Sequence, residues 1–99
     1  VNIYPAEIEH VFSQHDKVIE SAVVAWPSKA FGEEIAAFVV TRPDAVGTMD
    51  ADVLLKWCSE NLARYKLPRE IFFVEDLPKS GVGKVLKAKL TERLSPLDD

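Results

Sequence analysis

The chain has 99 residues, which is enough for one small domain that buries roughly 60–65% of its unfolded surface. Hydrophobic residues make up 47% and charged residues 28% of it, and the net charge is −4, so the composition excludes an intrinsically disordered chain. The one cysteine, Cys58, excludes an internal disulfide and a CxxC metal site, and two histidines are too few for a zinc site. No apolar run reaches the ~18 residues of a membrane span. The chain begins at Val1 without a methionine, which leads us to expect a fragment.

Hydrophobic periodicity predicts six elements in chain order. They are a helix over 5–15, strands over 18–26 and 35–40, a helix over 51–64, a strand over 71–74 and a helix over 84–94. Pro5 suits the first position of a helix, and Asp50 is a good N-cap. Residues 35–40 are apolar throughout, which indicates a strand that is covered on both faces or central in the sheet, and the short link before them favours an antiparallel pair. We therefore expect a single α+β domain over 1–99, with about three mostly antiparallel strands flanked by three helices in the order α-β-β-α-β-α.

Charge is unevenly distributed along the chain. Residues 1–60 carry four basic and ten acidic side chains, whereas residues 64–93 carry eight basic and four acidic ones. A local cationic surface on an acidic protein suits an anionic small ligand better than bulk nucleic acid. An ordinary solvated face with lysines would give the same pattern, so composition leaves both interpretations open.

The most informative segment covers residues 77–85 and has the sequence Leu-Pro-Lys-Ser-Gly-Val-Gly-Lys-Val. A phosphate-binding P-loop requires Gly where this chain has Pro78, and Ser or Thr where it has Val85, so a nucleotide hydrolase of that type is excluded. What remains is Lys84 on a loop in which Gly81 and Gly83 permit unusual backbone angles and close approach to a ligand. An exposed lysine on a surface turn is the simpler alternative. Cys58 lies on an apolar helix stripe and is expected in the core rather than as a nucleophile.

The whole chain resembles the C-terminal domain of the adenylate-forming acyl-CoA synthetases. Five segments carry the resemblance in order, from residue 1 to about 94. They are Asn-Ile-Tyr-Pro-Ala-Glu-Ile-Glu at 2–9, Ser-Ala-Val-Val-Ala-Trp-Pro at 21–27 with Gly-Glu at 32–33 and Ala-Phe-Val-Val at 37–40, Arg-Tyr-Lys-Leu-Pro at 64–68, Ile-Phe-Phe-Val at 71–74, and Pro-Lys-Ser-Gly-Val-Gly-Lys at 78–84. Each segment is weak alone, but the ordered set is specific.

The resemblance implies a fatty-acid or related acyl-CoA ligase. Such enzymes first join a carboxylic acid and ATP into an acyl-adenylate with release of pyrophosphate, and coenzyme A then displaces AMP. A large N-terminal domain, absent here, holds the acid, ATP and Mg²⁺, and the small domain alternates between two orientations. The resemblance therefore implies a partner domain in the same polypeptide, a cytoplasmic location, no nucleic acid and no membrane span. This domain alone is expected to be inactive.

The resemblance also assigns site residues. It makes Lys84 the adenylation lysine, a positioned cation that offsets charge in the transition state. The signature loop around it includes Pro78, Ser80, Gly81 and Gly83, and the candidates for coenzyme A contacts are Gly32, Glu33 and Lys66. Similar family members are switched off by acetylation of this lysine, which implies an acetyltransferase and a deacetylase as partners. No metal ligands are expected in this chain.

Two other functions stay open at this point. The first is the C-terminal domain of a nonribosomal-peptide adenylation enzyme. In that class the central tyrosine is usually followed by Met and the signature Gly-Lys by Asp two positions later, whereas this chain has Lys66 and Leu86 there. The second is a non-catalytic module that binds phosphate or RNA through the basic segment. Phe72 and Phe73 alternate faces, so at least one is expected in the core rather than on an RNA-binding surface.

Overall fold

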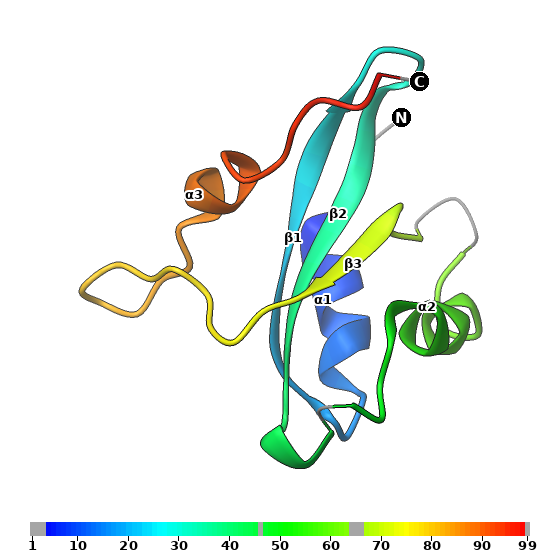
Figure 1. Ribbon diagram of the computed structural model, residues 1–99, viewed down its shortest axis with the longest axis vertical. Coiled ribbons are helices and arrows are strands. Elements are labelled where there is room, and N and C mark those ends of the chain that lie inside the picture. The colour runs from blue at the N-terminus through cyan, green and yellow to red at the C-terminus, as the bar shows by residue number, and fades with distance from the viewer. Residues whose placement is uncertain (1–3, 46, 64–66, 99) are drawn as a thin grey trace.

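The computed structural model describes residues 4–45, 47–63 and 67–98. Its elements surround one sheet with the strand order β1-β2-β3 (Figure 1). They are α1 (Pro5–Ser13), β1 (Val18–Ser28), β2 (Gly32–Thr41), a 3-10 turn (Pro43–Ala45), α2 (Ala51–Ser59), β3 (Glu70–Phe73) and α3 (Lys87–Thr91). The predicted α+β fold and its element order are confirmed. In the part of the chain that the structure describes, no helix has the length and apolar character needed to cross a membrane.

The sheet is mixed. β1 and β2 form a long antiparallel hairpin from Val18↔Thr41 to Ser28↔Gly32, as predicted, and Gly32 turns it with a φ of 77°. β2 and β3 pair in parallel over 36–39 and 70–73, because the chain crosses over through α2 between them. The antiparallel hairpin supplies most of the ladder, and β2 becomes the central strand.

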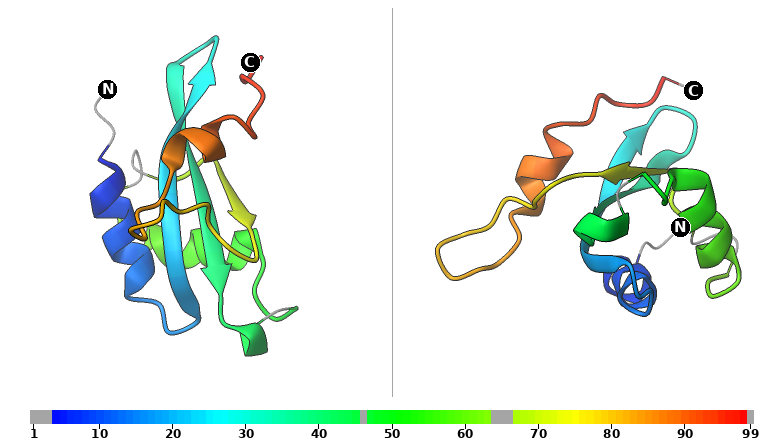
Figure 2. Two further views of the ribbon diagram at one scale, coloured as in Figure 1. Left: turned by 90° about the vertical axis from the view of Figure 1, so that its left-hand side faces the viewer. Right: turned by 60° about the horizontal axis from the view of Figure 1, so that its bottom comes forward.

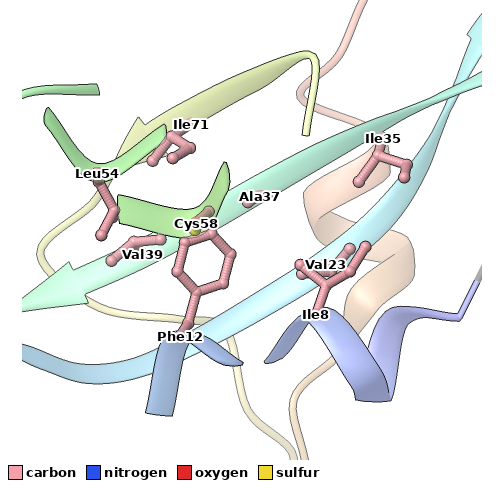
Figure 3. Packing of buried hydrophobic residues seen from close by; sticks show 9 residues of the cluster. All are labelled: Ile8, Phe12, Val23, Ile35, Ala37, Val39, Leu54, Cys58 and Ile71. Carbon is pink, nitrogen blue, oxygen red and sulfur yellow. The ribbon is translucent and has the colours of Figure 1, made fainter. Parts of the chain in front are cut away.

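β2 separates two hydrophobic clusters, and every residue from Ile35 to Val40 is buried. The first cluster lies on the α1 and α2 side of the sheet (Figure 3), and its members are Ile8, Phe12, Val23, Ile35, Ala37, Val39, Leu54, Cys58 and Ile71. The second lies on the α3 side, and its members are Ala22, Val24, Ala36, Phe38, Val40, Leu77 and Leu90. Side chains alternate along a strand, so one apolar run supplies both clusters. The prediction that this strand is covered on both faces is confirmed.

Both expected helix starts are present. Pro5 occupies the first turn of α1, where its missing N–H costs nothing. The backbone N–H of Val53 donates to Asp50 Oδ1 at 2.9 Å, which is the predicted N-cap of α2 and is typically worth about 1 kcal/mol. α2 ends at Ser59, earlier than the predicted 64, a position outside the described residues.

Among the predicted boundaries that differ from the structure, the end of β1 and the start of α3 have clear local reasons. β1 continues through Pro27 to Ser28, because β1 is an edge strand and an edge tolerates a proline without an N–H. α3 begins at Lys87 rather than at 84, because Val85 pairs with Lys79 and the N–H of Leu86 donates to the Pro78 carbonyl at 2.8 Å. Lys84 therefore lies in a loop and not in a helix.

Candidate functional site

Residues 78–86, called the lysine loop from here on, project from the α3 side of the sheet (Figures 1 and 2). Apolar residues fix the loop at both ends. Leu77 directly precedes the loop and Leu90 lies in α3 after it; they are 3% and 0% exposed in the second cluster, and Val85 packs against that cluster. Burial of a leucine side chain contributes about 1.5–3 kcal/mol, so both ends of the loop are firmly seated.

The two legs of the lysine loop are joined as a short hairpin. Lys79 and Val85 form an antiparallel bridge, and the N–H of Leu86 donates to the Pro78 carbonyl at 2.8 Å. Nearer the tip, the N–H of Ser80 donates to the Lys84 carbonyl at 2.8 Å. The loop is therefore a hydrogen-bonded projection rather than a free coil.

The tip is a tight turn from Ser80 to Gly83. The N–H of Gly83 donates to the Ser80 carbonyl at 2.9 Å, and Gly83 has a φ of 87°, the left-handed region that other residues rarely adopt. Gly81 does not have a positive φ, so the expectation that both glycines take unusual angles holds only for Gly83. Val82 is 92% exposed at this tip.

Two lysines on either side of the turn, Lys79 before it and Lys87 at the start of α3, form ion pairs with carboxylates from the first quarter of the chain. Lys79 Nζ lies 2.9 Å from Glu20 Oε2 on β1, and Lys87 Nζ lies 2.8 Å from Glu9 Oε2 on α1. The hydrogen bond to Glu20 raises the pKa of Lys79, and the charges of Glu20 and Asp76 add to this effect against partial desolvation. Sequence reasoning missed both carboxylates, because no motif links residues so far apart.

Lys84 differs from these two neighbours. Its backbone is held by Ser80, but within residues 4–45, 47–63 and 67–98 its ammonium group forms no ion pair or hydrogen bond, and the residue is exposed. A compact ammonium on a braced, projecting loop is suited to meet an anionic group held by another body. The predicted site residues Pro78, Ser80, Gly81, Gly83 and Lys84 are thus brought together in one loop.

The candidates for coenzyme A contacts lie elsewhere. Gly32 and Glu33 are exposed at the start of β2, beside the turn of the β1–β2 hairpin. Figures 1 and 2 show this hairpin turn and the lysine loop at separate places on the molecule in all three views. Lys66 lies outside the described residues.

Neither a reactive thiol nor a metal cluster is present in the described part of the chain. Cys58 is fully buried, and burial raises the pKa of its thiol to about 11, so it stays protonated and is not a nucleophile at neutral pH. No group of three or more His, Cys, Asp or Glu side chains in this part is placed to hold a metal ion.

The aromatic side chains of β3 do not form an open base-stacking platform. Phe72 stacks on Phe38 at a ring-centroid distance of 5.2 Å and packs against the second cluster, while Phe73 is 38% exposed. Phe72 is therefore part of the core packing, as the alternation of side chains along the strand predicts.

Residues 7–84 match the family described as the AMP-binding enzyme C-terminal domain. The chain belongs to this family. It is 46% identical over 94 residues to a 2-succinylbenzoate–CoA ligase of Listeria monocytogenes, covering 95% of this chain and 19% of that protein. It is 43% identical over 91 residues to a long-chain-fatty-acid–CoA ligase of Salmonella typhimurium, covering 92% of this chain and 16% of that protein.

Solved structures of the family agree with this assignment. The ATP-bound structure of MatB from Rhodopseudomonas palustris has a TM-score of 0.86 at 38% identity, and the match covers 94% of this chain and 18% of that one. The chain spans less than a fifth of the length of each of these two curated relatives. The activity, substrates and partners of a whole enzyme are therefore proposals for this chain.

Proposed function

We propose that this AMP-binding C-terminal domain belongs to an ATP-dependent acyl-CoA ligase and supplies Lys84 to its adenylate-forming step. The observation that carries the proposal is the contrast among the lysines at the loop. Lys79 and Lys87 are paired with carboxylates of the domain itself, whereas the Lys84 ammonium has no partner among the described residues. The two curated relatives named above are CoA ligases, which supports coenzyme A as the acceptor of the acyl group.

The chemistry explains what a cation at this position contributes. A carboxylate oxygen of the acid attacks the α-phosphorus of ATP, the bond from that phosphorus to the bridging oxygen breaks, and pyrophosphate leaves with the electron pair. Two anionic groups must approach each other, and charge grows on the phosphoryl oxygens. The Lys84 ammonium offsets this charge and holds the acid and phosphate in line. Coenzyme A then displaces AMP from the acyl-adenylate without needing the same contact.

Other parts of the reaction belong to the rest of the proposed enzyme. We propose that an N-terminal domain of the same polypeptide binds ATP, Mg²⁺ and the acid, and that this chain has no ligase activity alone. The described residues of this chain offer no metal-binding cluster. Gly32, Glu33 and Lys66 remain the candidates for coenzyme A contacts, and a cytoplasmic location remains a prediction.

The similarity of this domain to its relatives does not identify the acid substrate. Relatives named for 2-succinylbenzoate and for long-chain fatty acids match this chain at 46% and 43% identity, a small difference between very different acids. A long-chain fatty acid is one candidate, and a screen of acids with the whole enzyme would identify the substrate.

The decisive experiment separates the two half-reactions in the full-length enzyme. Lys84→Ala should slow acid-dependent ATP–pyrophosphate exchange by about 10²–10³-fold, the usual cost of a lost charge-stabilising donor, and spare thioester formation from supplied acyl-adenylate. Lys89→Ala is the matched control, because Lys89 is an exposed lysine of α3 with no side-chain partner in the described part of the chain. An equal loss in both half-reactions would contradict the assignment.

The exposure of Lys84 also makes it accessible to modification. We propose that acetylation of its ammonium switches off adenylation, because an amide carries no charge to offset the transition state. Mass spectrometry of the native enzyme should find acetyl-Lys84 while the ion-paired Lys79 stays unmodified. Repeated detection of unmodified Lys84 alone would count against this regulation.

A further inference from the structure

The incoming leg of the lysine loop and the first residue of α3, which directly follows the outgoing leg, are tied to carboxylates from other elements. We infer that Glu20 and Glu9 are positioning residues for Lys84, because their ion pairs with Lys79 and Lys87 hold the loop in the place that adenylation requires. This inference rests on the proposed function of Lys84. It adds two residues that never touch substrate to the residues on which the step depends.

Glu20 holds the incoming leg. Alternation along β1 places Glu20 on the same face as Ala22 and Val24, which is the face that α3 covers. Its Oε2 lies 2.9 Å from Lys79 Nζ, although the two residues are 59 positions apart. The backbone of Lys79 also pairs with Val85 on the opposite leg of the loop. The ion pair of Lys79 therefore restrains the position of both legs.

Glu9 holds the outgoing leg from the other face of the sheet. Its Oε2 accepts a hydrogen bond from the Val23 N–H at 2.8 Å and lies 2.8 Å from Lys87 Nζ. β1 is an edge strand, so the Val23 N–H points away from β2 and is free to fix this carboxylate. Lys87 is the first residue of α3. Its ion pair with Glu9 therefore links the start of α3 to the backbone of β1.

These ion pairs are suited to placement more than to stability. All four side chains are 25–42% exposed, and ion pairs at such surfaces contribute little to folding. A catalytic group displaced by about 1 Å can nevertheless cost a large factor in rate. Both pairs also neutralise lysines beside the turn, so the Lys84 charge acts without two competing cations next to it.

The test uses the full-length enzyme and neutral variants of each carboxylate. Glu20→Gln and Glu9→Gln remove the charge, and in Glu9→Gln the amide oxygen of the new side chain can still accept the Val23 N–H. Each variant should lower kcat for adenylation roughly two- to fivefold, the range that loss of a weak surface ion pair gives, with KM for ATP and acid within about twofold. Thioester formation from supplied acyl-adenylate and the melting temperature should stay unchanged.

The matched control is Asp98→Asn, which breaks the 2.7 Å Lys29–Asp98 ion pair beside the turn of the β1–β2 hairpin and should leave adenylation unchanged. A charge swap, Glu20→Lys with Lys79→Glu, rebuilds the pair in reverse and should recover most of the adenylation rate. Hydrogen exchange of the loop peptide should be faster in Glu20→Gln and return to normal in the swap.

The outcomes separate this inference from the proposed function. If Lys84→Ala cripples adenylation while both glutamine variants leave it unchanged, the positioning role is overturned and the lysine assignment stands. Failure of the charge swap to recover the rate, or an equal loss in both half-reactions, also overturns the positioning role. If Lys84→Ala itself spares adenylation, the proposed function fails first.

Discussion

Lys84 and Ser80 are joined by two contacts at the tip of the lysine loop. The Lys84 carbonyl accepts the Ser80 N–H at 2.8 Å, and the Lys84 N–H donates to Ser80 Oγ at 3.2 Å. The backbone of Lys84 is therefore fixed on both sides while its ammonium stays free of partners in the described part of the chain. This combination of a fixed origin and an unpaired charge is what a delivered cation requires.

The first prediction concerns the Ser80 hydroxyl. Ser80→Ala leaves the Lys84 N–H without its side-chain acceptor, and a lost hydrogen bond of this kind is worth about 0.5–1.5 kcal/mol, less where water can replace it. We expect a two- to fivefold lower adenylation rate in pyrophosphate exchange with the full-length enzyme, about 0.5–1 kcal/mol. Ser80→Thr keeps the hydroxyl and should retain the rate. Equal rates in Ser80→Ala and the unmodified enzyme would show that the hydroxyl contact is dispensable.

The second prediction compares the two glycines of the turn. A Cβ at either Gly81 or Gly83 would meet no atom within 4 Å, so space does not distinguish them. Gly83 has a φ of 87° and Gly81 has no positive φ, so only Gly83→Ala forces a side chain into the left-handed region, at about 1–2 kcal/mol. Gly83→Ala should slow adenylation and Gly81→Ala should not. Matching losses in both variants would contradict the assigned turn.

The third prediction tests the seat of the loop. Leu90 is 0% exposed in the second cluster, so Leu90→Ala should lower the free energy of unfolding by about 2–5 kcal/mol in urea denaturation of the 99-residue chain. Val82 is 92% exposed, so Val82→Ala should change it by less than about 0.5 kcal/mol. A small effect of Leu90→Ala would mean that α3 does not anchor the loop.

The fourth prediction concerns Cys58. Burial raises its pKa from 9.0 to about 11, so the folded thiol should resist a maleimide at neutral pH and react after denaturation. The unfolded chain loses the thiol proton at lower pH than the folded one. The contribution of Cys58 to stability is therefore complete below about pH 9 and is lost as pH rises toward 11.

Cys58→Ala isolates this effect from other groups that titrate at high pH. The difference in unfolding free energy between the unmodified chain and this variant should shrink between pH 9 and pH 11, in the range that the shifted pKa defines. A constant difference across that range would contradict the buried, protonated thiol.

Local signals predict the parts of the fold that depend on neighbouring residues. The Asp50 cap, Pro5 at the start of α1 and the doubly covered strand over 35–40 are each visible within a few positions of sequence, and each is confirmed. The predicted start of α3 is too early, because the Lys79–Val85 bridge competes with helix formation at 84–86 and the apolar period does not report it.

The candidate site divides in the same way. The loop residues around Lys84 are contiguous, so a motif can locate them. Glu9 and Glu20 reach the loop only through the fold, and a lone glutamate in a strand or helix carries no signal for the lysine it will meet. The parallel pairing of β3 is equally invisible in the sequence, because it depends on where the crossover returns.

The position of β2 between two clusters has a consequence for melting. Ile35, Ala37 and Val39 belong to one cluster and Ala36, Phe38 and Val40 to the other, so neither side can loosen without disturbing the wall that both share. Heat or denaturant should therefore unfold both sides in one cooperative transition. The packing that anchors the lysine loop should therefore show no separate unfolding transition. It should be lost only when α1 and α2 also detach from the other face of the sheet.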